Sequence, residues 1–225
     1  MEGPSAETIA ELKVKHGEIW LVDFDIGGFI HRKPSQAETD AYLLGLVRQQ
    51  NAEAAGNLIF SARLWPSVEQ LEAQLEEAPA VVVNCAKRVL DTSGGDDETV
   101  AAVSALSEIK HLTPEDRAEL ESRIGQKLEI LENAHPRGCL RYCRLPTVGV
   151  SIFRRPTRTS FTAFTDSSST DEIMQACRDL CAECAITDAK ALPSLFSNLP
   201  AISFNLAYAL AGLAGAHYEV KSGKL

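Results

Sequence analysis

The sequence has 225 residues, 45% apolar and 24% charged, which is typical of a folded protein and excludes the disordered and fibrous classes. Its 31 acidic and 22 basic residues give a net charge of −9, which opposes binding to a nucleic-acid backbone. No apolar run reaches the roughly 20 residues that cross a bilayer, and the first residues lack a secretory pattern. We therefore expect a soluble intracellular chain without nucleic-acid or membrane partners.

An internal repeat organises the sequence. Residues 30–35 (IHRKPS) recur as residues 152–157 (IFRRPT), 122 positions later. The same spacing pairs four further positions: Ala41 with Ala163, Tyr42 with Phe164, Ala54 with Ala176, and Leu58 with Leu180. After a one-residue deletion near position 188, a proline, an asparagine and a glycine still match. Because these residue types mark turns and caps, we favour a duplication over chance agreement between two Ala- and Leu-rich helices.

The first copy follows an N-terminal extension at 1–16. Alternating side chains at 18–24, a turn at Gly27-Gly28 and a second alternating run at 29–32 predict a β-hairpin. Pro34 ends the second strand, and Ser35-Gln36-Ala37-Glu38 predicts a capping box that starts a helix. The expected helices are 36–49, 51–63 and 67–92, the last of them broken at Pro79 and stopped by Gly94-Gly95.

The second copy repeats this order, and an acidic segment separates the two. Strands are expected at 140–145 and 151–154, and helices at 157–165, 170–186 and 190–213, with a break at Pro200. The intervening residues 96–133 hold 10 acidic and 4 basic side chains. Two apolar stripes, one from Val100 to Ile109 and one from Leu120 to Leu131, together with the helix start at Thr113-Pro114, predict a helical hairpin. Its apolar side either packs on its own domain or receives a partner helix.

The predicted fold is therefore α+β, with two tandem repeats, each a short β-hairpin followed by three to four helices, joined by a helical hairpin insert. The expected segments are an N-terminal extension at 1–16, repeat 1 at 17–95, the acidic insert at 96–137, repeat 2 at 138–217 and a C-terminal tail at 218–225.

The cysteines invite a metal interpretation. Cys181 and Cys184 form a CxxC pair, with Cys139 and Cys143 as further candidate zinc ligands. However, residues 177, 181 and 184 share one face of a single helix, whereas zinc ligands usually come from turns. A redox CxxC would need its first cysteine at a helix N-terminus. We therefore favour small buried thiols, with zinc as the alternative and disulfides disfavoured in an unexported chain.

Catalytic motifs are not visible in the sequence. It contains no GxSxG elbow, no HExxH helix and no phosphate loop, and its five histidines are scattered. We therefore predict a protein that is not an enzyme and needs no cofactor.

Basic pairs recur at both strand-to-helix junctions. Arg32-Lys33 in the first copy corresponds to Arg154-Arg155 in the second, where Arg158 follows. These side chains either bind an acidic partner or make intrachain bonds to a carboxylate and to carbonyl groups. A position repeated in two copies fits both interpretations.

The order of these motifs resembles the small tail assembly chaperone-like proteins of tailed bacteriophages. The resemblance rests on Phe153-Arg154-Arg155-Pro156-Thr157, on Leu64-Trp65-Pro66-Ser67, and on the helix starts at 78–81 and 199–202. It covers about 17–95 and 138–216. It differs from the family in carrying two copies plus an insert, and in having Thr187-Asp188 where the first copy has Trp65-Pro66.

The resemblance implies a non-enzymatic morphogenesis protein that shields apolar helices of a tape measure, tail tube or baseplate protein in the bacterial host cytoplasm. The alternatives are a structural tail or baseplate component of the virion and a zinc-binding interaction protein. Self-association remains compatible with either. The candidate partner-binding residues are Arg32, Lys33, Arg154, Arg155, Arg158 and Trp65.

Overall fold

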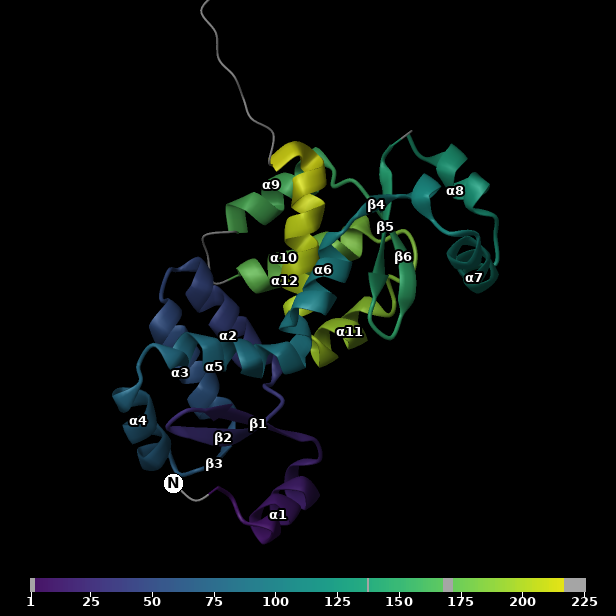
Figure 1. The fold of residues 1–225 in the computed structure, drawn as a ribbon. Coiled ribbons are helices and arrows are strands. Elements are labelled where there is room, and N and C mark those ends of the chain that lie inside the picture. Colours follow the sequence, from purple (N-terminus) through teal and green to yellow (C-terminus); the bar gives the residue numbers. More distant parts are fainter. Residues whose placement is uncertain (1–2, 137, 168–171, 217–225) are drawn as a thin grey trace, which may run out of the picture. The chain divides into compact units, whose positions relative to one another are not determined.

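The computed structural model describes residues 3–136, 138–167 and 172–216. It is a mixed α+β protein with two small three-stranded antiparallel sheets and many helices (Figure 1). The chain divides into two compact units. The first ends at Asp97 and also contains Ser197–Ile202, and the second begins at Glu98. Within the described residues, no helix combines the length and apolarity needed to cross a membrane. The predicted tail at 218–225 lies outside the described residues.

The hairpin of the first unit consists of β1 (Ile19–Phe24) and β2 (Gly27–Arg32). Their register pairs Phe24 with Gly27, so the turn contains Asp25 and Ile26. The prediction of a turn at Gly27-Gly28 is therefore wrong, because both glycines lie within β2. A Cβ atom on Gly27 would come 2.4 Å from the side-chain oxygen of Gln74. This glycine therefore leaves room for the Gln74 side chain and does not form the turn.

A third strand and four helices complete the predicted part of this unit. The helices α2 (Gln36–Val47) and α3 (Asn51–Ala62) lead to β3 (Arg63–Trp65), which pairs with β2 and was not predicted. The capping box of Ser35 and Glu38 is confirmed. The break at Pro79 is also confirmed, since it separates α4 (Val68–Glu77) from α5 (Val81–Leu90). A π-helical turn (Asp91–Gly95) follows, in which Gly94 adopts a φ of +82°.

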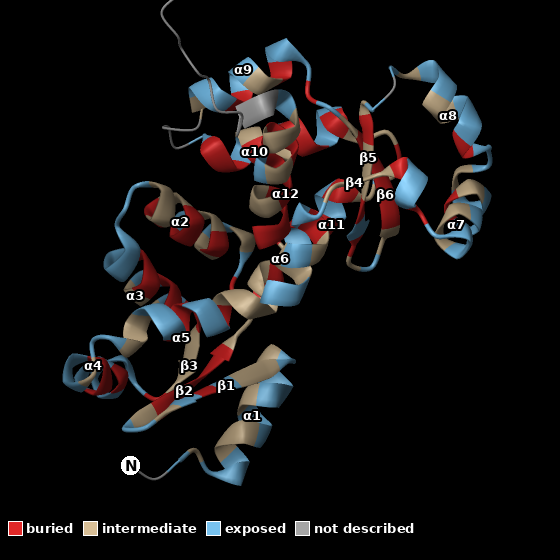
Figure 2. Cartoon of the chain, turned by 45° about the horizontal axis from the view of Figure 1, so that its top comes forward, coloured by how far each residue is buried: buried red, intermediate tan, exposed pale blue. Residues whose placement is uncertain are grey.

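The predicted N-terminal extension contains a helix, α1 (Ala6–His16), that starts at the N-cap Ser5. The helix has no buried residue, and Val14 is 90% exposed. Figure 2 shows that burial also differs between the strands of the sheet: β2 is largely buried, whereas β1 is mostly half-buried or exposed. The first sheet is thus well covered on its inner strand and sparsely covered on β1.

The second unit also contains a hairpin followed by four helices, but its third strand precedes the hairpin instead of following the second helix as β3 does. The strands β5 (Leu140–Leu145) and β6 (Gly149–Arg154) form the hairpin. The helices that follow are α9 (Arg158–Ser167), α10 (Ile173–Cys184), α11 (Leu192–Asn198) and α12 (Ala201–Ala211), and a π-helical turn ends the series at Gly212–Ala216. The break predicted at Pro200 therefore falls between α11 and α12. The start of α10 predicted at residue 170 lies outside the described residues. The element order supports the tandem repeat, which as a whole stays a prediction.

The acidic insert is more divided than a helical hairpin. It forms α6 (Asp97–Ser104), β4 (Ser107–Glu108), a 3₁₀ turn (Ile109–His111), α7 (Pro114–Ile124) and α8 (Leu128–Ala134). The prediction of two continuous helices is wrong for two reasons. The chain leaves the first helix at Ser104 so that β4 can pair with β5, and Gly125 breaks the second with a φ of +69°.

The apolar side of the insert packs on its own unit, which confirms the first of the two predicted outcomes. Leu120 and Leu128 are 1% and 0% exposed, and they cluster with the sheet residues Leu140, Val150 and Ile152. Tyr142 of β5 packs against the same cluster and donates its hydroxyl hydrogen to the carbonyl oxygen of His111 at 3.2 Å. One face of the second sheet is therefore covered by the insert.

Candidate functional site

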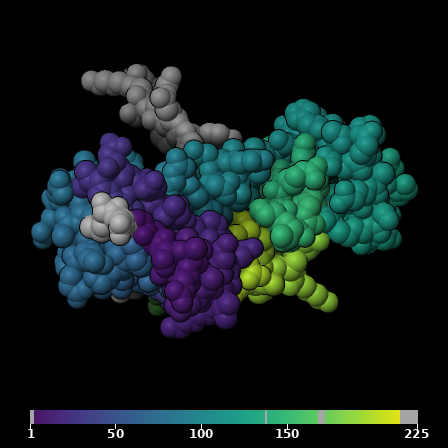
Figure 3. All heavy atoms as spheres, turned by 60° about the horizontal axis from the view of Figure 1, so that its bottom comes forward, coloured from purple at the N-terminus to yellow at the C-terminus, as the bar shows by residue number. Residues whose placement is uncertain are grey.

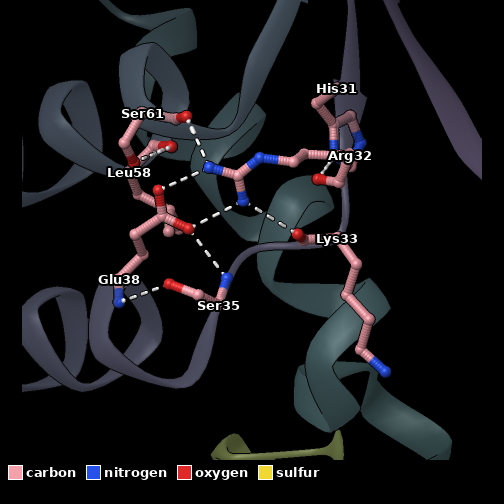
Figure 4. Close-up of polar contacts among 7 residues, drawn as sticks. All are labelled: His31, Arg32, Lys33, Ser35, Glu38, Leu58 and Ser61. Carbon is pink, nitrogen blue, oxygen red and sulfur yellow. Dashed lines mark hydrogen bonds and ion pairs between the residues drawn. The ribbon is translucent and has the colours of Figure 1, made fainter. Parts of the chain in front are cut away.

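Arg32 is held by contacts within its own unit. Its guanidinium donates to both carboxylate oxygens of Glu38, at 2.8 and 2.7 Å, and to the carbonyl oxygens of Lys33 and Ser61 (Figure 4). These bonds join the end of β2, the first turn of α2 and the end of α3. The planar guanidinium suits this paired geometry, which a lysine could not reproduce.

The carboxylate of Glu38 also closes the helix cap of α2. It accepts from the backbone N–H of Ser35 at 2.7 Å, while the Ser35 hydroxyl accepts from the N–H of Glu38. The hydrogen bond from Arg32 is the main reason that the pKa of Glu38 falls from 4.5 to about 2. Glu38 is therefore ionised at neutral pH, and its charge is matched by Arg32.

The second unit has an arginine at the corresponding position, with a different acidic partner. Arg154 donates to Glu183 of α10 at 3.0 Å, and the Thr157 hydroxyl contacts the same carboxylate at 3.4 Å. Thr157 also accepts from the N–H of Ser160, as Ser35 does from Glu38. At a spacing of 122 residues, Ser160 stands where the first unit has Glu38, and Glu183 stands where it has Ser61. The carboxylate that pairs with the arginine therefore comes from α2 in the first unit and from α10 in the second.

The other predicted basic residues face outward. The Lys33 side chain points away from the Arg32 contacts in Figure 4, and Arg155 and Arg158 are exposed. Within the described part of the chain, the side chains of these three residues make no hydrogen bond or ion pair. The structure thus separates the six candidates: two arginines make intrachain bonds, three cations face solvent, and Trp65 lies apart in β3.

Beside the Arg32 contacts runs groove 1, between α2 and α3, with a volume of about 300 Å³. Tyr42 and Leu58, 6% and 2% exposed, lie at its floor. The other lining residues are small or polar: Ala37, Glu38, Ala41, Ala54, Asn57 and Ser61. Glu38 and Ser61 also contact Arg32, so the arginine lies at one end of this groove.

Groove 2, between α9 and α10, has the same volume of about 300 Å³. Seven of the eight residues that line groove 1 have a counterpart 122 positions later that lines groove 2: Ser160, Ala163, Phe164, Ala176, Asp179, Leu180 and Glu183. Phe164 and Leu180 are 5% and 2% exposed, close to their counterparts in groove 1. The four residue pairs that revealed the repeat in the sequence therefore line the same hollow in both units.

Trp65 belongs to a second kind of surface. It pairs with Ile30 across the sheet and borders a wider groove around the β1–β2 turn and the end of α4. That groove is lined by Asp23, Asp25 and Glu77 as well as by Leu21 and Ile26, which are 61% and 37% exposed.

Most of the cysteines are interior residues, whereas the prediction of a buried thiol is wrong for Cys139. Cys143, Cys177, Cys181 and Cys184 are buried, whereas Cys139 is partly exposed. Burial raises the thiol pKa of Cys143 and of Cys184 to about 12 and also raises that of Cys181. None of the described cysteines forms a disulfide, and in the described ranges no three Cys, His, Asp or Glu side chains are grouped to hold a metal ion.

A family model matches residues 12–102, and its description is a domain of unknown function (DUF6848). This span covers less than half of the chain. It contains groove 1, the Arg32 contacts and Trp65, and it stops before groove 2. Neither a curated protein nor a solved structure matches the sequence significantly.

The grooves could have been located from the sequence. Ala41, Tyr42, Ala54 and Leu58 are spaced so that two adjacent helices present small and large apolar residues to each other. The repeat preserved them, but the repeat alone does not show that they line a surface hollow. The sequence contains no pattern that predicts β3, the strand that places Trp65 beside Ile30, because Arg63–Trp65 is too short to show an alternation of side chains.

Proposed function

We propose that this chain is a non-enzymatic morphogenesis protein of the tail assembly chaperone type. In this role it shields apolar helices of a phage tail protein, such as a tape measure protein, in the host cytoplasm. Groove 1 and groove 2 each bind one row of apolar side chains on such a helix. Binding of an amphipathic helix in a groove between two helices is a common recognition mode and requires no chemical step.

The observation that carries this proposal is the correspondence of the two grooves. Ala41 and Ala163 are exposed at the rims, while an aromatic residue and a leucine form each floor. A partner helix can place a large apolar side chain between such alanines and exclude water from the floor. The motif resemblance to phage tail assembly chaperones supplies the class of partner.

A structural tail or baseplate component is the second candidate. The same observation supports it, because two corresponding grooves in one chain can also hold two neighbouring subunits permanently. The two candidates differ in where the chain resides once assembly has ended: a chaperone leaves, and a component stays in the virion tail.

The test co-expresses this chain with the tape measure protein that the proposal predicts in the same genome. We expect the chain to keep that protein soluble and to co-purify with it. The double variant Ala41→Arg and Ala163→Arg should abolish co-purification without unfolding the chain, because both alanines are exposed. Ala52→Arg and Ala182→Arg, exposed on the same pair of helices but outside the grooves, form the matched control.

Retained co-purification of the groove variant would contradict the grooves as the binding site. The amount of chain in purified virions then separates the two candidates. A chaperone should be absent from mature particles, and a stoichiometric amount of the chain there would replace the chaperone assignment with that of a tail component.

A further inference from the structure

The two sheets differ in one respect that bears on binding. In the second unit, the face that carries Tyr142 is covered by the insert. The corresponding strand position in the first unit is Leu21, because Leu21 pairs with Ile30 as Tyr142 pairs with Ile152. Leu21 is 61% exposed. The first unit has no insert, and α1, which contacts β1, leaves this leucine open.

The open face of the first sheet extends from Leu21 to the β1–β2 turn. Leu21, Ile30 and Trp65 pair across the three strands and so lie on one face. Ile30 is buried and Trp65 half-buried, so the open part of this face is Leu21 on β1 and the edge of Trp65. Ile26 in the turn adds a second exposed aliphatic side chain. Figure 3 shows the purple N-terminal region at the surface of this unit. Exposed aliphatic side chains beside exposed carboxylates on a monomer surface are characteristic of an interaction site.

The charges that line the groove around the turn have a single sign, whereas the neighbouring hollow beside Leu21 also contains Arg88, which pairs with Asp91. Asp23, Asp25 and Glu77 are exposed and line the groove around the turn, and no Lys or Arg is among its described lining residues. None of the three carboxylates has an ion pair within the described part of the unit. Glu77 is the last residue of α4, whose last turn has no basic residue, so the negative end of the helix dipole adds to this potential.

The second unit shows how such a face is covered. Arg144 occupies the position of Asp23, and its guanidinium pairs with Asp116 of α7 at 2.5 Å. Arg123 of α7 donates to the carbonyl oxygens of Val148 and Val150 around the turn. The covering helix therefore supplies apolar side chains and charges opposite to those of the strand. On the first sheet the strand charge is reversed, so the complementary helix is basic.

We infer that the open face of the first sheet binds a basic amphipathic helix of a partner protein. The aliphatic side chains of that helix pack on Leu21 and Trp65, and its Lys or Arg side chains pair with Asp23, Asp25 and Glu77. This surface is separate from groove 1 and groove 2, so it does not depend on the proposed function.

The probes are two synthetic amphipathic peptides of about 18 residues, long enough to form helix in solution, with the same leucine pattern and either Lys or Glu on the polar face. The chain has two tryptophans, at 20 and 65, so Trp20→Phe leaves Trp65 as the reporter of binding. We expect the Lys peptide to shift the Trp65 emission to shorter wavelength with saturation, and the Glu peptide to leave it unchanged.

Three variants, each made in the Trp20→Phe background, test which side chains contribute to binding. Asp23→Asn, Asp25→Asn and Glu77→Gln together should weaken binding about tenfold or more, since each exposed pair contributes a fraction of a kcal/mol up to about 1. The control Glu53→Gln, Glu72→Gln and Glu76→Gln removes the same charge from exposed residues outside the groove and should leave affinity within about twofold. Leu21→Ser should weaken binding as well.

Equal binding of both peptides, or an equal loss in the control variant, would overturn the inference. So would full binding by Leu21→Ser, or a dimer in solution that the acidic triple variant dissociates, because a second copy would then occupy the face. The groove variant Ala41→Arg with Ala163→Arg should bind the Lys peptide normally, which separates this outcome from that of the proposed function.

Discussion

The first and second sheets have matching hairpins with different surroundings. In the second unit, the insert covers one sheet face with Leu120 and Leu128, and Tyr142 lies beneath it. In the first unit, the corresponding Leu21 stays exposed among carboxylates. The same hairpin therefore carries an internal cover in one unit and an open binding face in the other. The comparison therefore locates, in the first unit, a sheet face that the chain itself leaves uncovered.

The largest expected effect on stability comes from a substitution in the insert that covers the second sheet. Leu128→Ala should destabilise the second unit by about 2–5 kcal/mol, because the leucine is fully buried in the cluster beneath the insert. Leu21→Ala should change stability by less than about 0.5 kcal/mol. Urea unfolding followed by far-UV circular dichroism measures both. Because both tryptophans lie in the first unit, a Leu128→Ala transition that shifts equally in tryptophan fluorescence would contradict a local effect.

The Arg32 contacts should give the next largest effect, and it should depend on pH. Folding lowers the pKa of Glu38 from 4.5 to about 2, so its stabilisation is complete above pH 4.5 and is lost as the pH falls toward 2. Glu38→Gln should cost about 1–2 kcal/mol at pH 7, since the contact is partly exposed to solvent. The difference from wild type should shrink between pH 4.5 and 2. A difference that is constant with pH would exclude the ionised carboxylate as its source.

A smaller effect on stability is expected when the carboxylate that pairs with Arg32 is moved from α2 to α3. Glu38→Ser alone should destabilise the first unit, and adding Ser61→Glu should recover about 0.5–1 kcal/mol, because the second unit pairs Arg154 with an acid at that position. Lys33, whose side chain points away from the contacts, provides the control as Lys33→Gln. No recovery in the double variant would show that the capping role of Glu38 outweighs its pairing with Arg32.

The cysteines should give the smallest change in stability. In the native protein, Cys139 should react with a thiol reagent far faster than Cys143, Cys181 or Cys184, which are buried with raised thiol pKa values. Cys139→Ser should remove the fast reaction and leave the unfolding midpoint unchanged. Metal analysis of the same preparation should find less than about a tenth of an equivalent of zinc, and a stoichiometric amount would restore the zinc interpretation.

Much of the fold followed from local signals in the sequence. The capping box at Ser35, the breaks at Pro79 and Pro200 and the strands at 19–24 and 140–145 depend on nearest neighbours, and the structure has them. The errors involve contacts between distant segments. Gly27 and Gly28 suggested a turn, but Gly27 lies against the Gln74 side chain and Gly28 against the β1 backbone at Val22. Residues 107–108, which belong to a predicted helical stripe, form a strand that pairs with β5.

The candidate site was predicted in part for a similar reason. The arginines at the junctions were visible because they recur, but their partners Glu38 and Glu183 lie at positions that do not correspond. The exposed pair Leu21 and Asp23 carried no signal at all, because an alternating strand reads the same whether its outer face meets a helix or solvent.

The exchange between Glu38 and Glu183 also affects how distant relatives of this chain can be found. A sequence comparison that scores each position separately counts two unrelated substitutions between the units. At one position Glu38 corresponds to Ser160, and at the other Ser61 corresponds to Glu183. Around the arginine they are a single event, since either helix can supply the carboxylate to the same guanidinium. Searches that score both helix positions jointly with the arginine should therefore detect relatives that residue identity alone would miss.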